Sequence, residues 1–330
     1  MTIRDTFKTL LLAAGACGLA ASGMAGAQTP APFPSKTITL VVPFTPSSGS
    51  DIIARILAPK LAARWGQPVV VDNKPGASGN LGAKQVASAA PDGHTLLMAI
   101  NSFTMTPAIY KGMPFDAVAD FTPVAKLAEA GFTFAVNSSE PVKDMGALIA
   151  YLKKNEGKIN YATPGKGTPQ HLAMELFKSN AGVNVVHVPY KGIQGALTDL
   201  MGGQVQLMFA TVHSMRPSVE SGKVRMLAVT GQARNPLAPD VPTFREQGID
   251  YMDSVDAWYA VLAPARTPPE VVARLNRDFI EVMNTDDVKS ALAKQGLSVR
   301  TNTPAQMAAL IKSDMARWLK VVRDANIEAD

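Results

Sequence analysis

One short stretch of the sequence, residues 44–51, combines the residue types that bind a small anion. Thr45, Ser47 and Ser48 carry hydroxyl groups that donate hydrogen bonds without adding charge. Serine and aspartate are favoured helix N-caps, so a helix is expected to begin here. The N–H groups of a helix N-terminus are unpaired and the helix dipole is positive there, which favours a bound anion. The stretch predicts a carboxylate site; the alternative is a loop that only caps a helix, with its hydroxyls in water.

A second stretch, residues 163–170, repeats this plan of a strand, a small polar and glycine-rich turn, and a helix start. Its turn includes Lys166, which either reaches the ligand or is a solvated loop lysine. A Walker A loop has serine or threonine after its lysine. Here Gly167 follows instead, so nucleoside triphosphate binding is excluded. Another polar pair, Asn101 and Ser102, follows the strand-like run 95–100 and is expected at the same edge of the sheet.

Residues 72–82 are rich in glycine and offer a third way to cradle an anion. They do not form a G-x-G-x-x-G motif, and no suitably placed acidic residue follows, which argues against a dinucleotide site. We interpret Gly76, Gly79 and Gly82 as structural residues that let a turn and the next helix approach the sheet closely.

No set of residues has the spacing of a catalytic or metal site. The four histidines, His94, His171, His187 and His213, match no metal-ligand spacing, and His94 and His187 fall at or inside strands, which indicates structural roles. The sequence has no G-x-S-x-G elbow, and no spacing singles out a Ser–His–Asp triad. We therefore predict no catalytic residue, no metal and no cofactor.

Strand and helix patterns alternate along the chain and place these loops at one edge of a sheet. Extended runs are expected at residues 37–42, 69–71, 95–100, 132–136, 159–162, 184–188, 206–209, 224–229 and 258–262, and helical runs at 52–65, 81–89, 145–154, 171–179, 193–201, 216–221, 268–283, 288–295 and 304–325. Repeated strand–helix–strand units imply right-handed crossovers and a mostly parallel sheet. The run 69–71 is continuously apolar and is expected to be buried on both faces.

Composition fits a globular chain of two α/β lobes. Charged residues make up 18 % and hydrophobic residues 47 % of the 330 residues, which excludes a disordered chain. The net charge is +5, and residues 1–27 contribute two basic residues and one acidic residue, leaving about +4 for the remainder. No basic cluster is interleaved with aromatic residues, so nucleic acid is not an expected partner.

The N-terminus has the features of a secretory signal peptide. Arg4 and Lys8 precede an uncharged run at residues 10–21, and Ala25-Gly26-Ala27 offers a cleavage site before residue 28. The alternative is a retained membrane anchor. Residues 28–35 are expected to be a flexible lead-in. Cys17 is the only cysteine, so cleavage would leave a chain without disulfides or thiol chemistry.

A series of short motifs occurs in order along the rest of the chain. They are VPF at 42–44 leading to Asp51, GQPVVVDNKPG at 66–76, PDGHTLL at 91–97, VPYKG at 188–192, GKVRMLAVT at 222–230, DVPT at 240–243, and Trp258-Tyr259 before Ala263-Pro264. Together they resemble the tripartite tricarboxylate transporter substrate-binding proteins, the TctC-type or Bug receptors. The resemblance covers essentially all of the chain after residue 27.

The resemblance implies a two-lobed α/β periplasmic binding protein of the type II-like, Venus flytrap form. Each lobe would be a mostly parallel sheet flanked by helices, with the ligand in the cleft between. Residues 36–130 and 251–330, the latter including the C-terminal helices, would form lobe 1, and residues 131–250 lobe 2. The chain would be a monomeric receptor in the periplasm that captures a small organic carboxylate. It would deliver this ligand to the large and small membrane subunits of a transporter, or to a sensor.

The resemblance also implies which loops hold the ligand. One carboxylate would be held by the two loops identified above, together with ordered water, and the rest of the ligand would face two further loops of lobe 2. The residues carried over are Phe44, Thr45, Ser47, Ser48, Pro164, Gly165, Gly167 and Thr168 for the first end, and Tyr190, Lys191, Gly192, Phe209 and Thr211 for the second.

The sequence departs from the family pattern after Pro46, where relatives commonly have glycines and this chain has Ser47 and Ser48. The extra hydroxyls favour direct hydrogen bonds to a carboxylate and narrow the space. Neutral donors suffice, since each hydrogen bond to a charged group contributes about 1.5–3 kcal/mol. Phe44 and Phe209 would either flank an aromatic ring or pack in the core. A terephthalate-like aromatic acid is thus a candidate beside aliphatic di- and tricarboxylates.

Two other classes of function stay open at this point. A secreted hydrolase of esters or amides of such acids would need a nucleophile and a base, which no spacing displays. A structural or adhesion protein would need neither a ligand nor closure, and the paired helix starts rich in serine and glycine argue against it.

Overall fold

The alternating patterns form a mixed α/β sheet in a computed structural model, which describes residues 33–252, 255–324 and 327. Residues from Lys36 onwards form one compact unit. The predicted signal peptide and most of the predicted lead-in lie outside the described residues. Within the described part of the chain, no helix is both long and apolar enough to cross a bilayer.

The strands form one continuous sheet of ten strands in the order β2-β1-β3-β9-β4-β7-β5-β6, with β8 and β10 also paired to β4. We define the first lobe by strands β1 (Ile38–Val42), β2 (Val69–Asn73), β3 (Thr95–Ile100), β9 (Asp256–Pro264) and β10 (Ser298–Val299). We define the second lobe by strands β5 (Asn160–Thr163), β6 (Val186–Pro189), β7 (Leu207–Thr211) and β8 (Val224–Val229).

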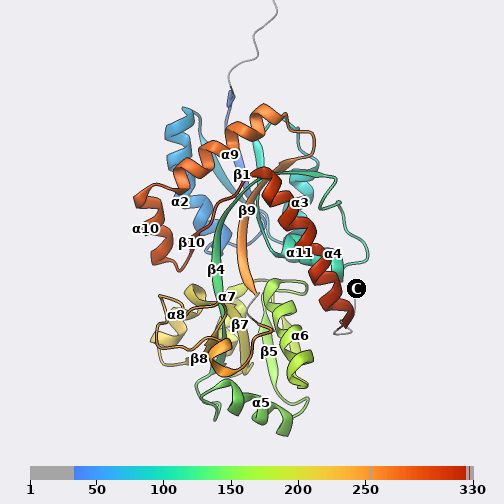
Figure 1. The fold of residues 1–330 in the computed structure, drawn as a ribbon, viewed down its shortest axis with the longest axis vertical. Helices are drawn as coiled ribbons and strands as arrows, with labels where there is room; N and C mark the ends of the chain where they lie inside the picture. Colours follow the sequence, from blue (N-terminus) through green and yellow to red (C-terminus); the bar gives the residue numbers. More distant parts are fainter. Residues whose placement is uncertain (1–32, 253–254, 325–326, 328–330) are drawn as a thin grey trace, which may run out of the picture. The chain divides into compact units, whose positions relative to one another are not determined.

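The long strand β4 (Phe121–Asn137) belongs to both lobes. Its residues from Phe121 to Gly131 pair with β9, and those from Phe132 to Asn137 pair with β7 and β8. Figure 1 shows β4 and β9 as long strands running from the helices of the first lobe toward the second. These two long strands therefore lie where the sheet passes from one lobe to the other.

Helices cover both lobes. The first lobe carries α2 (Gly49–Trp65), α3 (Asn80–Ala87), α4 (Ser102–Ile109), α9 (Pro269–Met283), α10 (Asp286–Lys294) and α11 (Pro304–Asp324). The second lobe carries α5 (Met145–Lys154), α6 (Pro169–Ala181), α7 (Ile193–Met201) and α8 (Val212–Glu220). Two short 3-10 turns, Ala77–Gly79 and Arg245–Gln247, complete the described elements. α2 ends at Gly66, which has a φ of 65° in the left-handed region that glycine adopts without strain.

Each lobe has its own apolar core. In the first, the rings of Phe103, Phe115 and Phe121 pack on one another, and Phe103 and Phe121 meet edge to face at 4.9 Å. In the second, Phe134 meets the rings of Phe177 and Phe209. These rings add to the burial of apolar surface that stabilises each lobe.

Buried carboxylates pin the helices of the first lobe. Asp278 of α9 is fully buried and accepts hydrogen bonds from Trp65 Nε1 at 2.7 Å and from Arg64 Nε at 2.9 Å, both on α2. Asp314 of α11 accepts from Thr104 Oγ1 on α4 at 2.6 Å. A buried carboxylate held in this way fixes the helices that supply its donors.

Three expectations differ from the structure. β2 is an edge strand with Val70 48 % exposed, so the run 69–71 is not buried on both faces, because apolar composition alone does not distinguish a central strand from an edge. Residues 101–104 are not a loop, since α4 begins at Ser102 directly after β3. The parallel β–α–β pairs are present, but β4 and β9 run antiparallel to their neighbours.

Candidate anion-binding site

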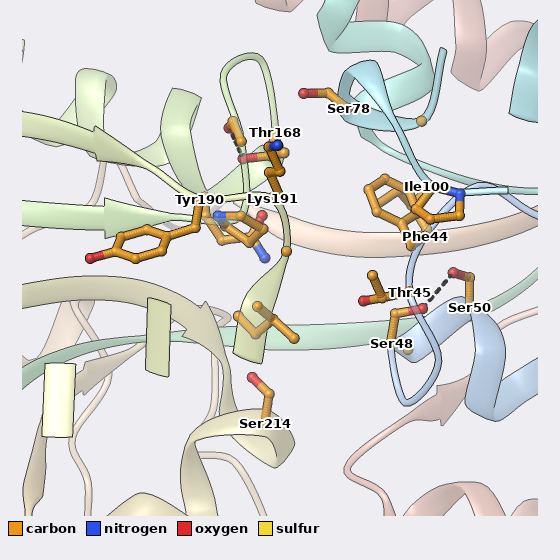
Figure 2. Close-up of a pocket in the computed structure, with 18 of the residues that line it drawn as sticks. Phe44, Thr45, Ser48, Ser50, Ser78, Ile100, Thr168, Tyr190, Lys191 and Ser214 are labelled. Carbon is orange, nitrogen blue, oxygen red and sulfur yellow. Dashed lines mark hydrogen bonds between the residues drawn. The ribbon is translucent and has the colours of Figure 1, made fainter. Parts of the chain in front are cut away.

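A cavity of about 590 Å³ lies between the two lobes. In Figure 2, Phe44, Thr45, Ser48, Ser50 and Ser78 line one side, and Thr168, Tyr190, Lys191 and Ser214 line the facing side. Most of the lining residues lie at or just after the carboxyl ends of β1, β2, β5, β6 and β7, which is where open α/β sheets bind ligands.

Four helices begin at this cavity. The residues that precede α2, α6, α7 and α8 all belong to its lining, and they are Ser48, Thr168, Gly192 and Thr211. Each helix N-terminus carries a partial positive charge and unpaired N–H groups. Their convergence from both lobes makes the interior favourable for negative charge.

The first turn of α2 offers free backbone donors. Ser48 caps the helix, with its Oγ accepting from Asp51 N at 3.4 Å and lying 3.3 Å from Ser50 Oγ. The Ser47 N–H donates to the Asp51 carboxylate at 2.9 Å. Among the residues that the structure describes, no acceptor is assigned to the N–H of Gly49 or Ser50. These two groups are therefore available to a ligand.

Asp51 holds the loop in this conformation. Arg55 Nε donates to both of its oxygens at 3.0 Å, and Asn73 Nδ2 donates to Oδ1 at 2.9 Å. Burial alone raises the pKa of Asp51, but the hydrogen bonds from Arg55, Ser47 and Asn73 outweigh it and hold the pKa below its usual value. The Asp51 carboxylate is thus ionised, and its oxygens are hydrogen-bonded within the protein. It rigidifies the loop but is not a lining residue, so it places no negative charge in the cavity wall.

Two histidines outside the cavity lining, His171 and His187, stabilise the loop between β5 and α6. Thr168 Oγ1 donates to Gly165 O at 2.7 Å, and the Gly167 N–H donates to His171 Nδ1 at 3.2 Å. The His171 ring stacks on His187 with 4.2 Å between centroids, and His187 Nε2 lies 2.7 Å from Thr163 Oγ1. Burial, followed by the nearby His171, lowers the pKa of His187 to about 3, so His187 is neutral at pH 7.

The charges of the cavity have one sign. Its lining includes Lys166 and Lys191, and none of the described lining residues is an aspartate or a glutamate. His213 also lines it, and burial lowers the pKa of this histidine to about 4, which leaves it neutral at pH 7. The cavity therefore favours an anionic ligand over a neutral or cationic one.

Most of the predicted contact residues come together here. Those in the lining are Phe44, Thr45, Ser47, Ser48, Pro164, Gly165, Thr168, Tyr190, Lys191, Gly192 and Thr211. Their assignment to ligand binding remains a prediction. Tyr190 offers the ligand its ring rather than its hydroxyl, because the hydroxyl already donates to Asp199 at 2.6 Å.

Four predicted residues lie outside the lining. Asn101 is fully buried. Its Nδ2 donates to the Asp256 carbonyl at 2.8 Å, and its Oδ1 accepts from the Trp258 N–H at 2.7 Å. Phe209 is fully buried against Phe132, which corresponds to its alternative role in the core. The remaining two, Ser102 in α4 and Gly167, are buried and face other parts of the protein.

The sequence prediction missed several lining residues, among them Ser78 and Tyr259. The 72–82 stretch does have the structural role expected, since a Cβ on Gly82 would lie 2.9 Å from the Cβ of Pro43. Yet Gly76 and Gly79 of the same stretch also line the cavity. Its glycine content was a signal for this second role. Tyr259 had no such signal, because a strand pattern does not say which side chain reaches a distant loop.

The two lobes touch beside the cavity. The Lys166 carbonyl accepts hydrogen bonds from Ser78 Oγ and, at 3.2 Å, from Tyr110 Oη. A Cβ on Gly192 would lie 3.5 Å from Thr45. We refer to the pair of hydrogen bonds to this carbonyl as the Lys166 contact; it joins the lobes in the arrangement that the structure describes.

The fold and cavity define a two-lobed binding protein for a small anion. The family model described as "Tripartite tricarboxylate transporter family receptor" matches residues 53–327, and the chain belongs to this family. It is 37 % identical to the UPF0065 protein in the tcbD-tcbE intergenic region of Pseudomonas sp. (strain P51), over 90 % of this chain and 89 % of that one.

Two solved structures are also similar. One is an R. palustris protein with adipate, which has a TM-score of 0.85 and 34 % identity and covers 90 % of this chain and all of its own. The other is MatC from Rhodopseudomonas palustris with bound malate, with a TM-score of 0.82 and 33 % identity, covering 88 % of this chain and all of its own. The family and the two-lobed α/β fold predicted from the sequence are thereby confirmed.

Proposed function

We propose that this chain is a periplasmic receptor that binds a small organic carboxylate and delivers it to the membrane subunits of a tripartite tricarboxylate-type transporter. The observation that carries the proposal is the cavity itself, in which four helix N-termini and two lysines converge and no described lining residue is acidic. The adipate and malate bound by the two similar proteins support the same ligand class.

The dimensions and lining of the cavity favour a di- or tricarboxylate. Its volume of about 590 Å³ lies within the range of ordinary ligand sites and leaves room for ordered water. Donors on both lobes suit an acid with a charged group at each end. Phe44 beside the first end leaves an aromatic acid such as terephthalate among the candidates, together with aliphatic acids.

We also propose that residues 36–130 with 251–330, and residues 131–250, are the two bodies that close on the ligand. The change of partners along β4 at Gly131 and Phe132 supports this division. Closure driven by a ligand requires that the ligand bind the closed form more tightly than the open form. A ligand that contacts donors from both lobes at once satisfies this condition.

The alternative function, a hydrolase, needs a general base with the right orientation and pKa, and the described lining of the cavity does not supply one. His213 is the histidine in the lining, and its Nε2 lies 3.4 Å from Thr211 Oγ1. Its buried Nδ1 has no partner among the described residues, so no carboxylate orients the ring as in a catalytic triad. Its pKa of about 4 also makes it a poor base at pH 7. We propose a receptor without turnover.

The test is a thermal-shift screen of residues 28–330 against mono-, di- and tricarboxylates, followed by calorimetric titration of those that raise the melting temperature. A ligand at 100 times its Kd stabilises the native state by about 2.7 kcal/mol. We expect a few related acids to bind with a stoichiometry of one and to be recovered unchanged. Binding of none, or hydrolysis of their esters or amides, would contradict the proposal.

A further inference from the structure

Tyr259 is a buried tyrosine whose hydroxyl has no hydrogen-bond partner in the part of the chain that the structure describes. It lies in β9, paired with Ile100 of β3, and only 4 % of its surface is exposed. It nevertheless belongs to the cavity lining. Among the residues that the structure describes, no hydrogen bond involves its hydroxyl. A hydroxyl without a protein partner at the wall of a cavity is usually satisfied by water or by a ligand.

The hydroxyl lies against the first residue of α2. A Cβ built on Gly49 would be 2.2 Å from Tyr259 Oη, so the glycine leaves the space that the phenol occupies. Gly49 and Ser50 both line the cavity, and their N–H groups are the free backbone donors described above. The tyrosine O–H and these N–H groups are therefore side by side at one end of the cavity.

The protonation state of Tyr259 suits a donor. Burial raises its pKa above the ordinary value, so the phenol remains protonated throughout the physiological range. A neutral O–H beside a helix N-terminus strengthens anion binding without placing a second charge in the site. Its strand β9 is paired on both sides, with β3 and β4, so the backbone that carries the donor is preorganised.

We propose that the Tyr259 hydroxyl donates a hydrogen bond to a carboxylate oxygen of the ligand, whose other oxygen faces the N-terminus of α2. The inference rests on the proposed carboxylate-binding function and adds a residue that fixes where the carboxylate lies. This hydrogen bond makes the first lobe specific for a carboxylate over the corresponding amide. An amide has one acceptor oxygen fewer, and its N–H group would face the protein's own donors.

The experiment compares Tyr259→Phe with the unmodified protein by calorimetric titration with the acids that the unmodified protein binds. Loss of one hydrogen bond to a charged group predicts an affinity lower by about 10- to 100-fold. The loss should be similar for every acid, because all of them share the carboxylate. The unliganded melting temperature should be unchanged or higher, since the hydroxyl makes no bond within the protein.

The matched control is Tyr151→Phe on α5, which also deletes a hydroxyl, one that interacts with Glu140 outside the cavity. We expect its affinity for the same acids to equal that of the unmodified protein. Equal affinity in Tyr259→Phe, or a loss matched by Tyr151→Phe, would overturn the role of Tyr259 and leave the receptor function intact. Failure of the unmodified protein to bind any acid would overturn both.

Discussion

Gly49, the first residue of α2, leaves the space that the Tyr259 side chain of β9 occupies. A Cβ there would lie 2.2 Å from Oη, 2.6 Å from Cζ and 2.8 Å from Cε1 of Tyr259. Contacts this short force a shift of either the helix start or the ring, and overpacking of this kind costs about 1–3 kcal/mol. We predict that Gly49→Ala lowers both the melting temperature and the affinity for the ligand, as thermal denaturation and titration would show.

Gly112→Ala is the control for that prediction. A Cβ on Gly112 meets nothing within 4 Å, and its φ lies outside the left-handed region, so the same chemical change carries no steric cost there. An equal loss of affinity in the two variants would show that space at Gly49 is not the cause.

The sequence predicted the residues of the site that act through local structure. Ser48 and Thr168 were identified because helix caps and turns have local signatures, and both line the cavity. Tyr259 and Tyr110 could not be identified in this way, since strand pairing and helix packing bring them to the loops from far along the chain. Asn101 was misplaced because a polar residue after a strand is equally suited to bonding the backbone of a neighbouring strand.

At the level of elements, Asp278 is a buried carboxylate that links α9 to α2. Asp278 accepts from Trp65, Arg64 and Arg274. We predict that Asp278→Ala destabilises the protein by about 1–3 kcal/mol, because it leaves the buried Trp65 N–H without its acceptor, whereas the partly exposed guanidinium groups of Arg64 and Arg274 can be solvated. Chemical denaturation would measure the change in the free energy of unfolding.

Asp287→Ala on α10 is the matched variant for Asp278. Asp287 pairs with Lys60 of α2, also linking a C-terminal helix to α2, but 60 % of its side chain is exposed. Solvent screens such pairs, so little change is expected. A large loss in Asp287→Ala together with a small one in Asp278→Ala would show that burial does not decide the strength of these links.

The order and type of most elements followed from periodicity and turn residues, and the runs 95–100, 145–154, 193–201 and 224–229 coincide with β3, α5, α7 and β8. The boundaries of β4 did not follow, because its first part, from Phe121 to Gly131, mixes buried and partly buried residues without a regular alternation. The edge position of β2 could not be predicted from the sequence either, since it depends on which strands assemble beside it.

For the molecule as a whole, the buried histidines make stability depend on pH. The pKa of His187 is about 3 in the native state, against about 6.5 when unfolded. Below pH 6.5 the unfolded state therefore takes up a proton that the native state does not. The resulting stability is present above pH 6.5 and is lost as pH falls toward 3, at up to about 1.4 kcal/mol per pH unit for one proton.

Denaturation curves at pH 6.5, 5.5 and 4.5 would test this dependence. His187→Phe keeps a ring between Tyr161 and His171 but does not titrate. It should be less stable at pH 6.5, because the contact with Thr163 is lost, and should show a smaller slope with pH. His213 contributes to the slope in the same direction and remains in this variant. An unchanged slope would mean that other groups cause the dependence.

The Lys166 contact has a kinetic consequence. The donors Ser78 and Tyr110 and the acceptor carbonyl all belong to the protein, so the contact needs no ligand atom to form. The empty receptor would then be shut for part of the time, and entry would wait for it to open. In stopped-flow mixing, the observed rate should level off at high ligand concentration, and Tyr110→Phe should raise that plateau. A rate that rises linearly throughout would indicate an empty receptor that stands open. With a plateau, capture in a rich medium is limited by the opening of the receptor rather than by how often it encounters its ligand.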